Sequence, residues 1–233
     1  QSLTANLSYY ATDPRGGAPL ANAWRISSDC ISWATCKSSF RIASGLGRFG
    51  GPGGFNDADM LLGSSLGAVR WLRKPQSRTQ FNLWAVLMSP LLIGARVSDL
   101  SDFDLETYSN AEVISVSQDA LGRQGFVAAE TRWSVVMARE LVGGDVALVF
   151  VSYAAFRAAD VVCDAACWGR LPFAVGTRLY VRDLWTHRFA EEPEGVAGLP
   201  YSVRVPPDGA SRMFRLTTSQ PFAGETATSP GPL

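Results

Sequence analysis

The change in sequence texture near Gly125 constrains the fold of this chain more than any other feature. Before it, apolar stretches alternate with glycine-rich turns, whereas after it short runs such as "DVALVFVSY" and "YSVRVPP" are separated by turn residues. The first pattern is typical of an α/β region and the second of an antiparallel β domain. We therefore expect an α/β region at 1–126, an antiparallel β domain at 127–218 and a polar, disordered tail at 219–233.

Helix signals place secondary structure inside the first region. The segment "RTQFNLWAVLMSPLLIGA" at 78–95 has the length and apolar face of a buried helix through about Met88. Pro90 ends this helix before a short predicted strand, "LLIG". Ser101 precedes several acidic residues and predicts the N-cap of a further helix.

The balance of charge and hydropathy excludes some partners. The chain has 233 residues, of which 47% are hydrophobic, enough to bury a substantial core. Lys and Arg together number 21, as do Asp and Glu, so no overall charge would attract a nucleic acid or an anionic membrane surface. The longest apolar runs are far shorter than the ~20 residues of a membrane-spanning helix. We expect neither nucleic acid nor membrane as a partner.

The cysteines indicate an oxidising compartment. The four cysteines fall into two close pairs: Cys30 with Cys36, and Cys163 with Cys167. Local disulfides, a metal site and free thiols are the alternatives. Zinc is disfavoured because His187 is the only histidine and neither pair has the spacing of a zinc knuckle. Together with a glycosylation motif at Asn6, the cysteines favour the secretory route.

A glycine-rich stretch leads into the most polar cluster of the chain. The segment "GGPGGFNDADM" at 50–60 places four glycines and a proline before two carboxylates, Asp57 and Asp59. Glycines at this density allow a tight turn or a close approach to a ligand. Two acids one residue apart can then face a polar substrate or a metal.

Two cofactor interpretations of this stretch fail on the neighbouring sequence. "GLGRFG" at 45–50 matches a dinucleotide-binding pattern, but Pro52 interrupts the helix that should follow, and no acidic residue occurs between Met60 and Ser98 to hold the ribose. A calcium loop would need further ligands after Asp59, where "MLLG" follows instead. The stretch is therefore predicted to be a polar loop.

Aromatic residues and the histidine of the second region have structural interpretations. We expect Trp133, Trp168 and Trp185 to belong to the core of the β domain rather than to a sugar-stacking platform. A surface or packing role is expected for His187 rather than a catalytic one.

Seven segments taken together resemble glycoside hydrolase family 27, the α-galactosidases and α-N-acetylgalactosaminidases. Their order and spacing are similar to the family's over about residues 20–217. The segments are "AWRISSD" (23–29), "GPGGFNDADML" (51–61), "LWAVLMSPLLIG" (83–94), "EVISVSQDALGRQG" (112–125), "CDAAC" (163–167), "RDLW" (182–185) and "PPDG" (206–209).

The resemblance implies a (β/α)₈ TIM barrel followed by an antiparallel β-sandwich. The chain would supply the C-terminal portion of the barrel, from strand five or six to strand eight, within 1–126, and the sandwich within 127–218. The implied function is a retaining glycoside hydrolase that removes terminal α-linked galactose or N-acetylgalactosamine from oligosaccharides or glycoconjugates.

The resemblance also assigns roles to residues in two segments. In "AWRISSD", Arg25 binds substrate, and Asp29, four residues later, is the general acid/base. In "NDADM", Asp59 and Met60 line the sugar pocket, and Asp57 contributes to the same substrate-binding loop.

The loop around these acids departs from the family in two places. Phe55 stands where the family usually has Trp, and Ala58 where it usually has Pro. We expect the glycines at 50–54 to turn the loop over the mouth of the barrel, where active sites of this fold lie, and so to place Asp59 against sugar hydroxyls.

The family's nucleophile has no counterpart in the chain. It is an Asp in a Lys-x-Asp pattern, and no such pattern occurs ahead of Trp24. A retaining glycosidase needs this carboxylate ~5 Å from the acid/base. We therefore expect a C-terminal part of the enzyme that is inactive in isolation. The alternative is an inactive fragment or pseudoenzyme that at most binds glycans.

The remaining expectations concern partners and covalent links. The resemblance implies α-galactoside-containing glycans as partners, no cofactor and no metal, and it leaves a homodimer open. The implied location is secreted, or the lysosomal or vacuolar lumen. Cys163 and Cys167 should form a family disulfide, whereas the state of Cys30 and Cys36 stays open. So does the choice between galactose and N-acetylgalactosamine, because 1–22 does not align with the family's specificity loop.

Overall fold

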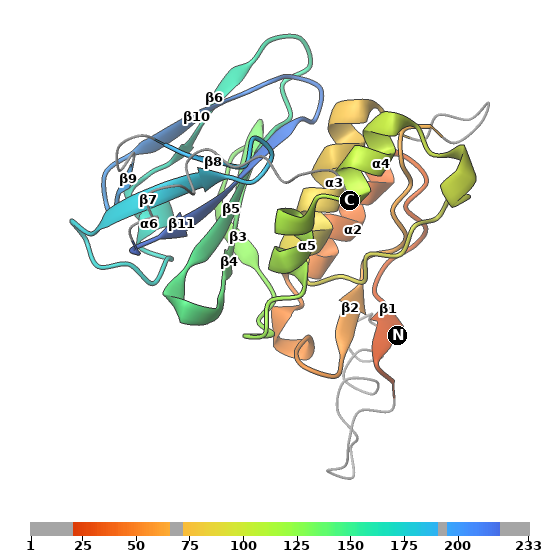
Figure 1. Cartoon of the computed structure of the whole chain (residues 1–233), viewed down its shortest axis with the longest axis horizontal. Coiled ribbons are helices and arrows are strands. Elements are labelled where there is room, and N and C mark those ends of the chain that lie inside the picture. The colour runs from red at the N-terminus through yellow and green to blue at the C-terminus, as the bar shows by residue number, and fades with distance from the viewer. Residues whose placement is uncertain (1–20, 66–71, 191–194, 220–233) are drawn as a thin grey trace.

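A computed structural model describes residues 21–65, 72–190 and 195–219 of the chain. A group of helices lies next to a large antiparallel sheet, and helix α3 (Lys74–Leu87) packs against strands of that sheet (Figure 1). The helical segments expected before Gly125 and the antiparallel strands expected after it are both present. Asn6 and the tail from 220 onward lie outside the described residues.

Two short parallel strands carry the first part of the chain. Strand β1 (Ala23–Arg25) pairs with β2 (Phe55–Asp57), and Trp24 lies opposite Asn56. The predicted strand "LLIG" is reduced to a single parallel bridge between Leu61 and Ile93. Backbone pairing between the segment after β2 and "LLIG" does not extend back to β2. There the Ala58 N–H donates to the Ser89 hydroxyl instead of to a strand partner. That prediction was therefore wrong in extent.

The helices begin and end at residues with recognisable chemistry. The predicted N-cap at Ser101 is confirmed, since its hydroxyl accepts a hydrogen bond from the Asp104 amide. The buried helix predicted from Arg78 to about Met88 begins earlier, at Lys74, because Pro75 suits a first helical turn, and it ends at Leu87. The other helices are α2 (Trp33–Ser44), α4 (Asp102–Tyr108), α5 (Ala111–Ser117) and α6 (Ala165–Trp168), with 3₁₀ turns at Gly47–Phe49, Val97–Asp99 and Val142–Gly144.

The second part forms two antiparallel layers. The large sheet has the strand order β3-β4-β5-β11-β7-β8, with β9 also paired to β7, and a smaller sheet pairs β6 with β10. The strands are β3 (Phe126–Glu130), β4 (Ser134–Glu140), β5 (Val146–Ser152), β6 (Ala159–Cys163), β7 (Arg178–Asp183), β8 (Arg188–Phe189), β9 (Gly195–Val196), β10 (Tyr201–Val205) and β11 (Ser211–Thr217).

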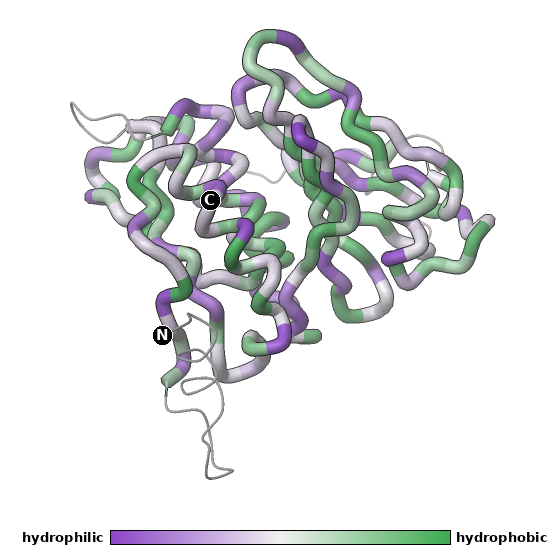
Figure 2. The backbone as a smooth tube through the Cα atoms, turned by 180° about the vertical axis from the view of Figure 1, so that it is seen from behind, coloured by the Kyte–Doolittle hydropathy of each residue, from purple (hydrophilic) through white to green (hydrophobic). Residues whose placement is uncertain are grey.

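The large sheet is buried on both faces. Along β4, Val135 and Met137 join the core that contains α3, whereas Val136 and Ala138 join a second core beneath β6 and β10. Successive side chains of a strand point to opposite faces, so one strand serves both cores. Strand β5 is buried at every position. The hydrophobic stretches in Figure 2 accordingly include these central strands.

A buried arginine ties the helices to the sheet. Arg139 of β4 is fully buried, and its Nη1 donates to the Ala85 carbonyl at 2.8 Å and to the Ser117 carbonyl at 3.2 Å. These carbonyls lie at the C-terminal ends of α3 and α5, where a cation is favoured by the helix dipole. Burial lowers the pKa of Arg139 to about 10. The guanidinium therefore stays charged at neutral pH.

The tryptophans of the second part occupy different environments. Trp168 is buried, and Trp185 packs against the core beside α3. Trp133, in contrast, is 57% exposed, so its predicted core position is wrong. It lies in the turn between β3 and β4, where its amide bonds the Thr131 hydroxyl, and its side chain therefore belongs to neither face of the sheet. His187 packs with its Nδ1 2.7 Å from a Glu112 carboxylate oxygen.

Candidate active site

Three charged side chains meet beyond the carboxyl ends of β1 and β2. A single nitrogen of Arg25, Nη2, lies 3.1 Å from an oxygen of Asp29 and also forms an ion pair with Asp59. Arg25 is the last residue of β1, and Asp59 follows β2 by two residues. Parallel pairing brings the two strand ends to one edge, so Arg25 and Asp59, 34 positions apart in sequence, become neighbours. The structure thus brings together Arg25, Asp29 and Asp59.

The two carboxylates have contrasting surroundings. The Asp59 side chain is only 6% exposed, and its Oδ2 accepts the Cys30 amide at 2.6 Å while its Oδ1 accepts the Met60 amide at 2.7 Å. The Asp29 side chain is 81% exposed, and its described contact is with Arg25. Asp59 is therefore a fixed acceptor, whereas Asp29 is open to an incoming molecule.

The Asp59 backbone adopts a strained conformation that its neighbours hold in place. Its φ is 89°, in the region that ordinarily favours glycine. The Asp59 amide donates to Asp57 Oδ1 at 2.8 Å, and its carbonyl accepts the indole N–H of Trp84 at 2.6 Å. Asp57 is thus a support for this turn. Strain of this kind persists only where surrounding contacts over-determine it, and it recurs at functional sites.

Helix α3 supplies two supports that the sequence analysis missed. Gln80 accepts the Leu62 amide and donates to the Met60 carbonyl, both at 3.0 Å, so its side-chain amide spans the loop after Asp59. Trp84 lies one helical turn further along the same face of α3. Both belong to the run that predicted a buried helix, and a polar Gln inside that run was the available signal. Met60 itself is 47% exposed beside this loop.

Both cysteine pairs form disulfides. The predicted Cys163–Cys167 bond is present. Cys30 and Cys36, whose state the sequence left open, are also joined. This second bond lies beside the charged cluster, because the Cys30 amide is a donor to Asp59 and the Gln80 amide group reaches the Cys30 sulfur at 3.3 Å. The Cys30–Cys36 bond therefore fixes a donor of the site.

The glycine-rich turn lies at the other end of β2 from the acids. Gly51 and Gly54 close a turn that precedes β2, whereas Asp59 follows it, so the expectation that this turn covers the site is wrong. The turn instead allows close packing, since a Cβ on Gly54 would come within 2.6 Å of the Trp24 ring. Asn56 is buried there as well, accepting from the Trp24 indole at 2.8 Å and donating to the Leu46 carbonyl at 2.9 Å.

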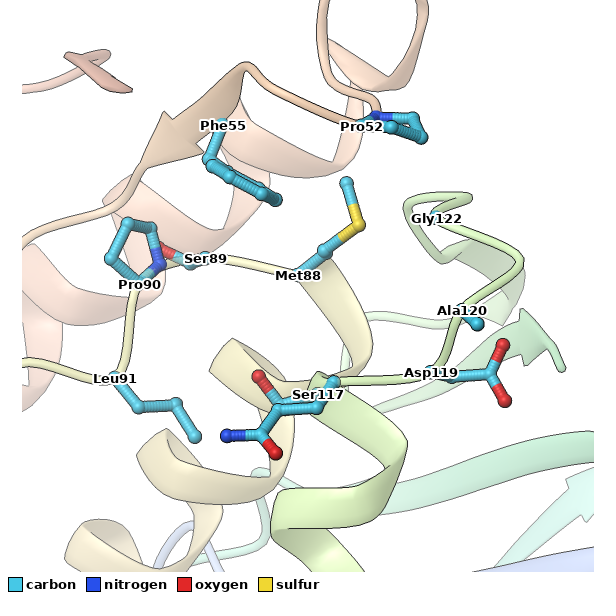
Figure 3. A pocket seen from close by; sticks show the side chains of 11 residues that line it. Pro52, Phe55, Met88, Ser89, Pro90, Leu91, Ser117, Asp119, Ala120 and Gly122 are labelled. Carbon is cyan, nitrogen blue, oxygen red and sulfur yellow. The ribbon is translucent and has the colours of Figure 1, made fainter. Parts of the chain in front are cut away.

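A hollow of about 510 Å³ lies apart from the charged cluster. Its lining comes from the turn before β2, the segment after α3 and the segment after α5. In Figure 3 the side chains of Phe55 and Met88 line it next to Pro52. None of Arg25, Asp29 and Asp59 borders it. Phe55, the first residue of β2, borders it, whereas the carboxylates follow that strand.

Two features are absent from the described ranges 21–65, 72–190 and 195–219. No helix there combines the length and hydrophobicity needed to cross a membrane. Nor do three side chains of His, Cys, Asp or Glu gather there in a group that could hold a metal ion.

Known proteins place this chain in one family. The family model described as "Alpha galactosidase A" matches residues 9–119. The curated α-galactosidase of Cyamopsis tetragonoloba is 33% identical over 169 residues, which is 72% of this chain and 39% of that protein. This chain belongs to glycoside hydrolase family 27, the α-galactosidase family. This chain spans less than half the length of the Cyamopsis tetragonoloba enzyme.

Solved structures of the family have the same fold. The α-galactosidase of Saccharomyces cerevisiae with raffinose matches 87% of this chain and 61% of its own length, with a TM-score of 0.68 and 18% identity. A family 27 β-L-arabinopyranosidase of Geobacillus stearothermophilus matches 95% of this chain and 48% of its own length, with a TM-score of 0.72 and 22% identity. At these identities the likeness extends to the fold and not to the substrate.

Proposed function

We propose that this family 27 chain carries the acid/base side of a retaining glycosidase site that removes terminal α-linked galactose or N-acetylgalactosamine. Asp29 is the general acid/base, and Arg25, Asp59 and Met60 hold the sugar, with Asp57 supporting the loop. The observation that carries the proposal is the contact of one Arg25 nitrogen with both an exposed and a buried carboxylate at a shared strand edge. Active sites of barrel enzymes lie at this end of the strands.

The exposures of the two acids support this division of roles. An acid/base must reach both the leaving oxygen and a water molecule, which the 81% exposed Asp29 side chain allows. A nucleophile must reach the anomeric carbon, whereas the Asp59 side chain is only 6% exposed and both its oxygens are held by backbone amides. Asp59 therefore suits binding better than attack. Its buried carboxylate orients Arg25, which in turn positions Asp29.

The complete reaction requires a second carboxylate. In a retaining mechanism the nucleophile attacks the anomeric carbon while Asp29 protonates the departing oxygen. Water then attacks the glycosyl-enzyme as Asp29 takes its proton, which returns both carboxylates to their starting states. We propose that an Asp of a Lys-x-Asp segment encoded upstream supplies the nucleophile. Residues 1–126 would then complete a barrel with that segment, and 127–218 would form the sandwich.

The proposed substrate class rests on the substrates named for the chain's relatives. Raffinose, bound in the yeast structure, is an α-galactoside, and we propose α-galactoside-containing glycans for this protein. The arabinopyranosidase supports a comparison assay, because an L-arabinopyranoside lacks the C6 hydroxymethyl group of galactose. The two cysteine pairs, both oxidised, support a secreted, lysosomal or vacuolar location.

Hydrolysis of aryl α-galactosides by the longest protein that the reading frame encodes tests the role of Asp29. The Asp29→Asn variant should lose about 10²- to 10⁴-fold in kcat/KM, as expected for removal of a general acid. The loss should be smaller for an aryl group that leaves easily, because such a group needs less protonation. Asp160→Asn makes the same change at an exposed acid of β6 and should have no effect. Equal losses for good and poor leaving groups would contradict the acid role.

The 233-residue chain alone tests the need for a second carboxylate. We expect no turnover of the α-galactoside or of the matching L-arabinopyranoside, because no glycosyl-enzyme can form without a nucleophile. A longer protein without activity that still binds galactose would instead support a pseudoenzyme that binds glycans. Turnover by the short chain would overturn the proposed division of the site.

A further inference from the structure

A second cleft lies between helix α2, the turn that joins β3 to β4 and the residue that follows β5. It encloses about 450 Å³ and shares no lining residue with the cluster of Arg25, Asp29 and Asp59. One wall is a face of α2 that carries Lys37 and Arg41, and the other is formed by Arg132, Trp133 and Tyr153. A volume of this size is within the range of small-molecule sites, which is roughly 300–1,000 Å³.

The cleft gathers cations that are only partly neutralised. Arg41 pairs with Glu130 at 2.5 Å, but no described residue forms an ion pair with Lys37 or Arg132. Lys37 Nζ lies 5.2 Å from the centre of the Tyr153 ring instead. The whole chain has equal numbers of acidic and basic residues, so this local excess of positive charge does not follow from its composition. Positive charge in a recess attracts an anionic ligand.

The backbone that carries the aromatic wall of the cleft is held by hydrogen bonds. The Trp133 amide donates to the Thr131 hydroxyl at 3.1 Å, and its carbonyl accepts the Tyr153 amide at 2.7 Å. Trp133 is nevertheless 57% exposed as a residue, with the Arg132 guanidinium 4.4 Å from its ring centre. An exposed, anchored ring offers a flat apolar surface at little cost in conformational entropy.

Tyr153 adds an uncharged aromatic ring to the wall of the cleft. Burial raises the pKa of Tyr153 to about 12. The hydroxyl oxygen is enclosed and has no well-formed hydrogen bond to another described side chain, although Arg41 lies near enough to act on it. Because this oxygen is enclosed, a ligand in the cleft meets the ring of Tyr153 rather than its hydroxyl.

We propose that this cleft binds a sugar ring bearing a carboxylate, such as a uronic acid residue of a glycan. The apolar face of the ring packs on Trp133, and the carboxylate lies between Lys37 and Arg132. The ring of Tyr153 contacts the sugar from the wall of the cleft. The ligand is a sugar rather than a nucleic acid because the cleft offers one exposed indole and a short cationic pair, whereas single-stranded nucleic acids require a groove with successive stacking rings. The site is separate from the proposed hydrolytic one.

Calorimetric titration of the longest encoded protein with trigalacturonate tests the proposal. The methyl ester of trigalacturonate is the matched neutral ligand, since it keeps the three rings but has neither free carboxylates nor a terminal galactose, and it should bind at least about tenfold more weakly. Raising the salt from about 20 to 200 mM should weaken only the binding of the acidic sugar, because screening acts on the ion pairs. Equal affinity for both sugars would overturn the proposal.

Variants separate this cleft from other sites. Trp133→Ala should weaken trigalacturonate binding by about tenfold or more, while Trp133→Phe should retain most of it. Lys37→Gln and Arg132→Gln should each weaken it, and Arg157→Gln, at an exposed arginine outside the cleft, should not. Asp29→Asn should leave this binding unchanged, so failure here is distinct from failure of the proposed hydrolysis. Tighter binding of oligothymidylate than of trigalacturonate would overturn the sugar in favour of a nucleic acid.

Discussion

In the helical part of this chain, buried polar side chains hold the loops, whereas in the sheet apolar side chains pack against one another. Asp59, Gln80 and Asp104 are all buried and all hydrogen-bonded to loop atoms. Strand β5, by comparison, buries a run of Val, Ala, Leu and Phe. Polar contacts fix directions and distances, while apolar burial is non-directional and supplies most of the free energy of folding. The charged cluster lies in the part where geometry is fixed by polar contacts.

The helical part thus depends on the sheet for stability. Its main helix, α3, shares one core with a face of β4 and β5. The sheet also has an independent core on its other face, beneath β6 and β10. We therefore expect substitutions that break the contact between the two parts to lower the free energy of unfolding most. Substitutions in exposed ion pairs should lower it least.

The largest effect is expected from Arg139→Ala. The change removes the cation that bonds the carbonyls ending α3 and α5, and it leaves a cavity in the shared core. The free energy of unfolding should fall by about 3–5 kcal/mol, as for other disrupted buried charge contacts. Urea unfolding followed by circular dichroism measures it. Arg204→Ala, at an exposed arginine, is the control, and an equally small change in both would contradict the role of Arg139.

A smaller loss is expected from Asp104→Asn in the helical part. Asp104 accepts from the hydroxyls of Ser64, Ser65 and Ser77, and an Asn would face these donors with its own N–H groups. The cost should be about 2–3 kcal/mol, since hydrogen bonds to a charged group are lost. Unfolding by urea measures this cost, and Asp102→Asn at an exposed position of the same helix is the control.

The same variant makes a prediction about acid. Burial alone would raise the pKa of Asp104, but hydrogen bonds, led by that from Ser65, outweigh burial and lower it. The carboxylate therefore contributes stability that is present above its unfolded pKa and is lost as the pH falls through the lowered folded value. Stability of the original protein should decline below about pH 4 more steeply than that of Asp104→Asn. Identical acid profiles would show that Asp104 is not the group responsible.

The two disulfides extend the comparison of the two parts. They close loops of similar length, one in the helical part and one beside the sheet. Replacing either pair by serines should cost about 2 kcal/mol, since both close short loops. Loss of Cys30–Cys36 should also lower kcat/KM, because the Cys30 amide holds Asp59. Loss of Cys163–Cys167 should change thermal unfolding only. Equal kinetic effects would show that the first bond has no special relation to the site.

The smallest effect is expected at the exposed pair Arg204–Asp160. Their side chains are 63% and 58% exposed, so water already solvates both charges. A double-mutant cycle should give a coupling of about 0.2–1 kcal/mol, decreasing with salt. A coupling as large as the effect of Arg139→Ala would undermine the distinction between buried and exposed charge on which these predictions rest.

The sequence by itself determined the local features of this protein. The change in sequence texture predicted helices before Gly125 and antiparallel strands after it. A serine followed by acidic residues predicted the helix cap at Ser101. The four-residue spacing of Cys163 and Cys167, together with the family resemblance, predicted their disulfide. These signals act over a few residues, through backbone geometry, hydrogen bonds of neighbours and alternation of side chains. Segment order also supplied Arg25, Asp29 and Asp59 as candidates through the resemblance.

Tertiary structure alone decided which of these residues meet. Arg25 and Asp59 share an edge because β1 and β2 pair in parallel, and Gln80 and Trp84 support the loop because α3 packs against it. Neither relation has a local signature, since each depends on backbone pairing or packing between segments distant in sequence. For the same reason local reasoning misplaced Trp133 and the glycine turn. A residue type indicates what a side chain can do, whereas its neighbours in space decide whether it is buried, paired or open to a ligand.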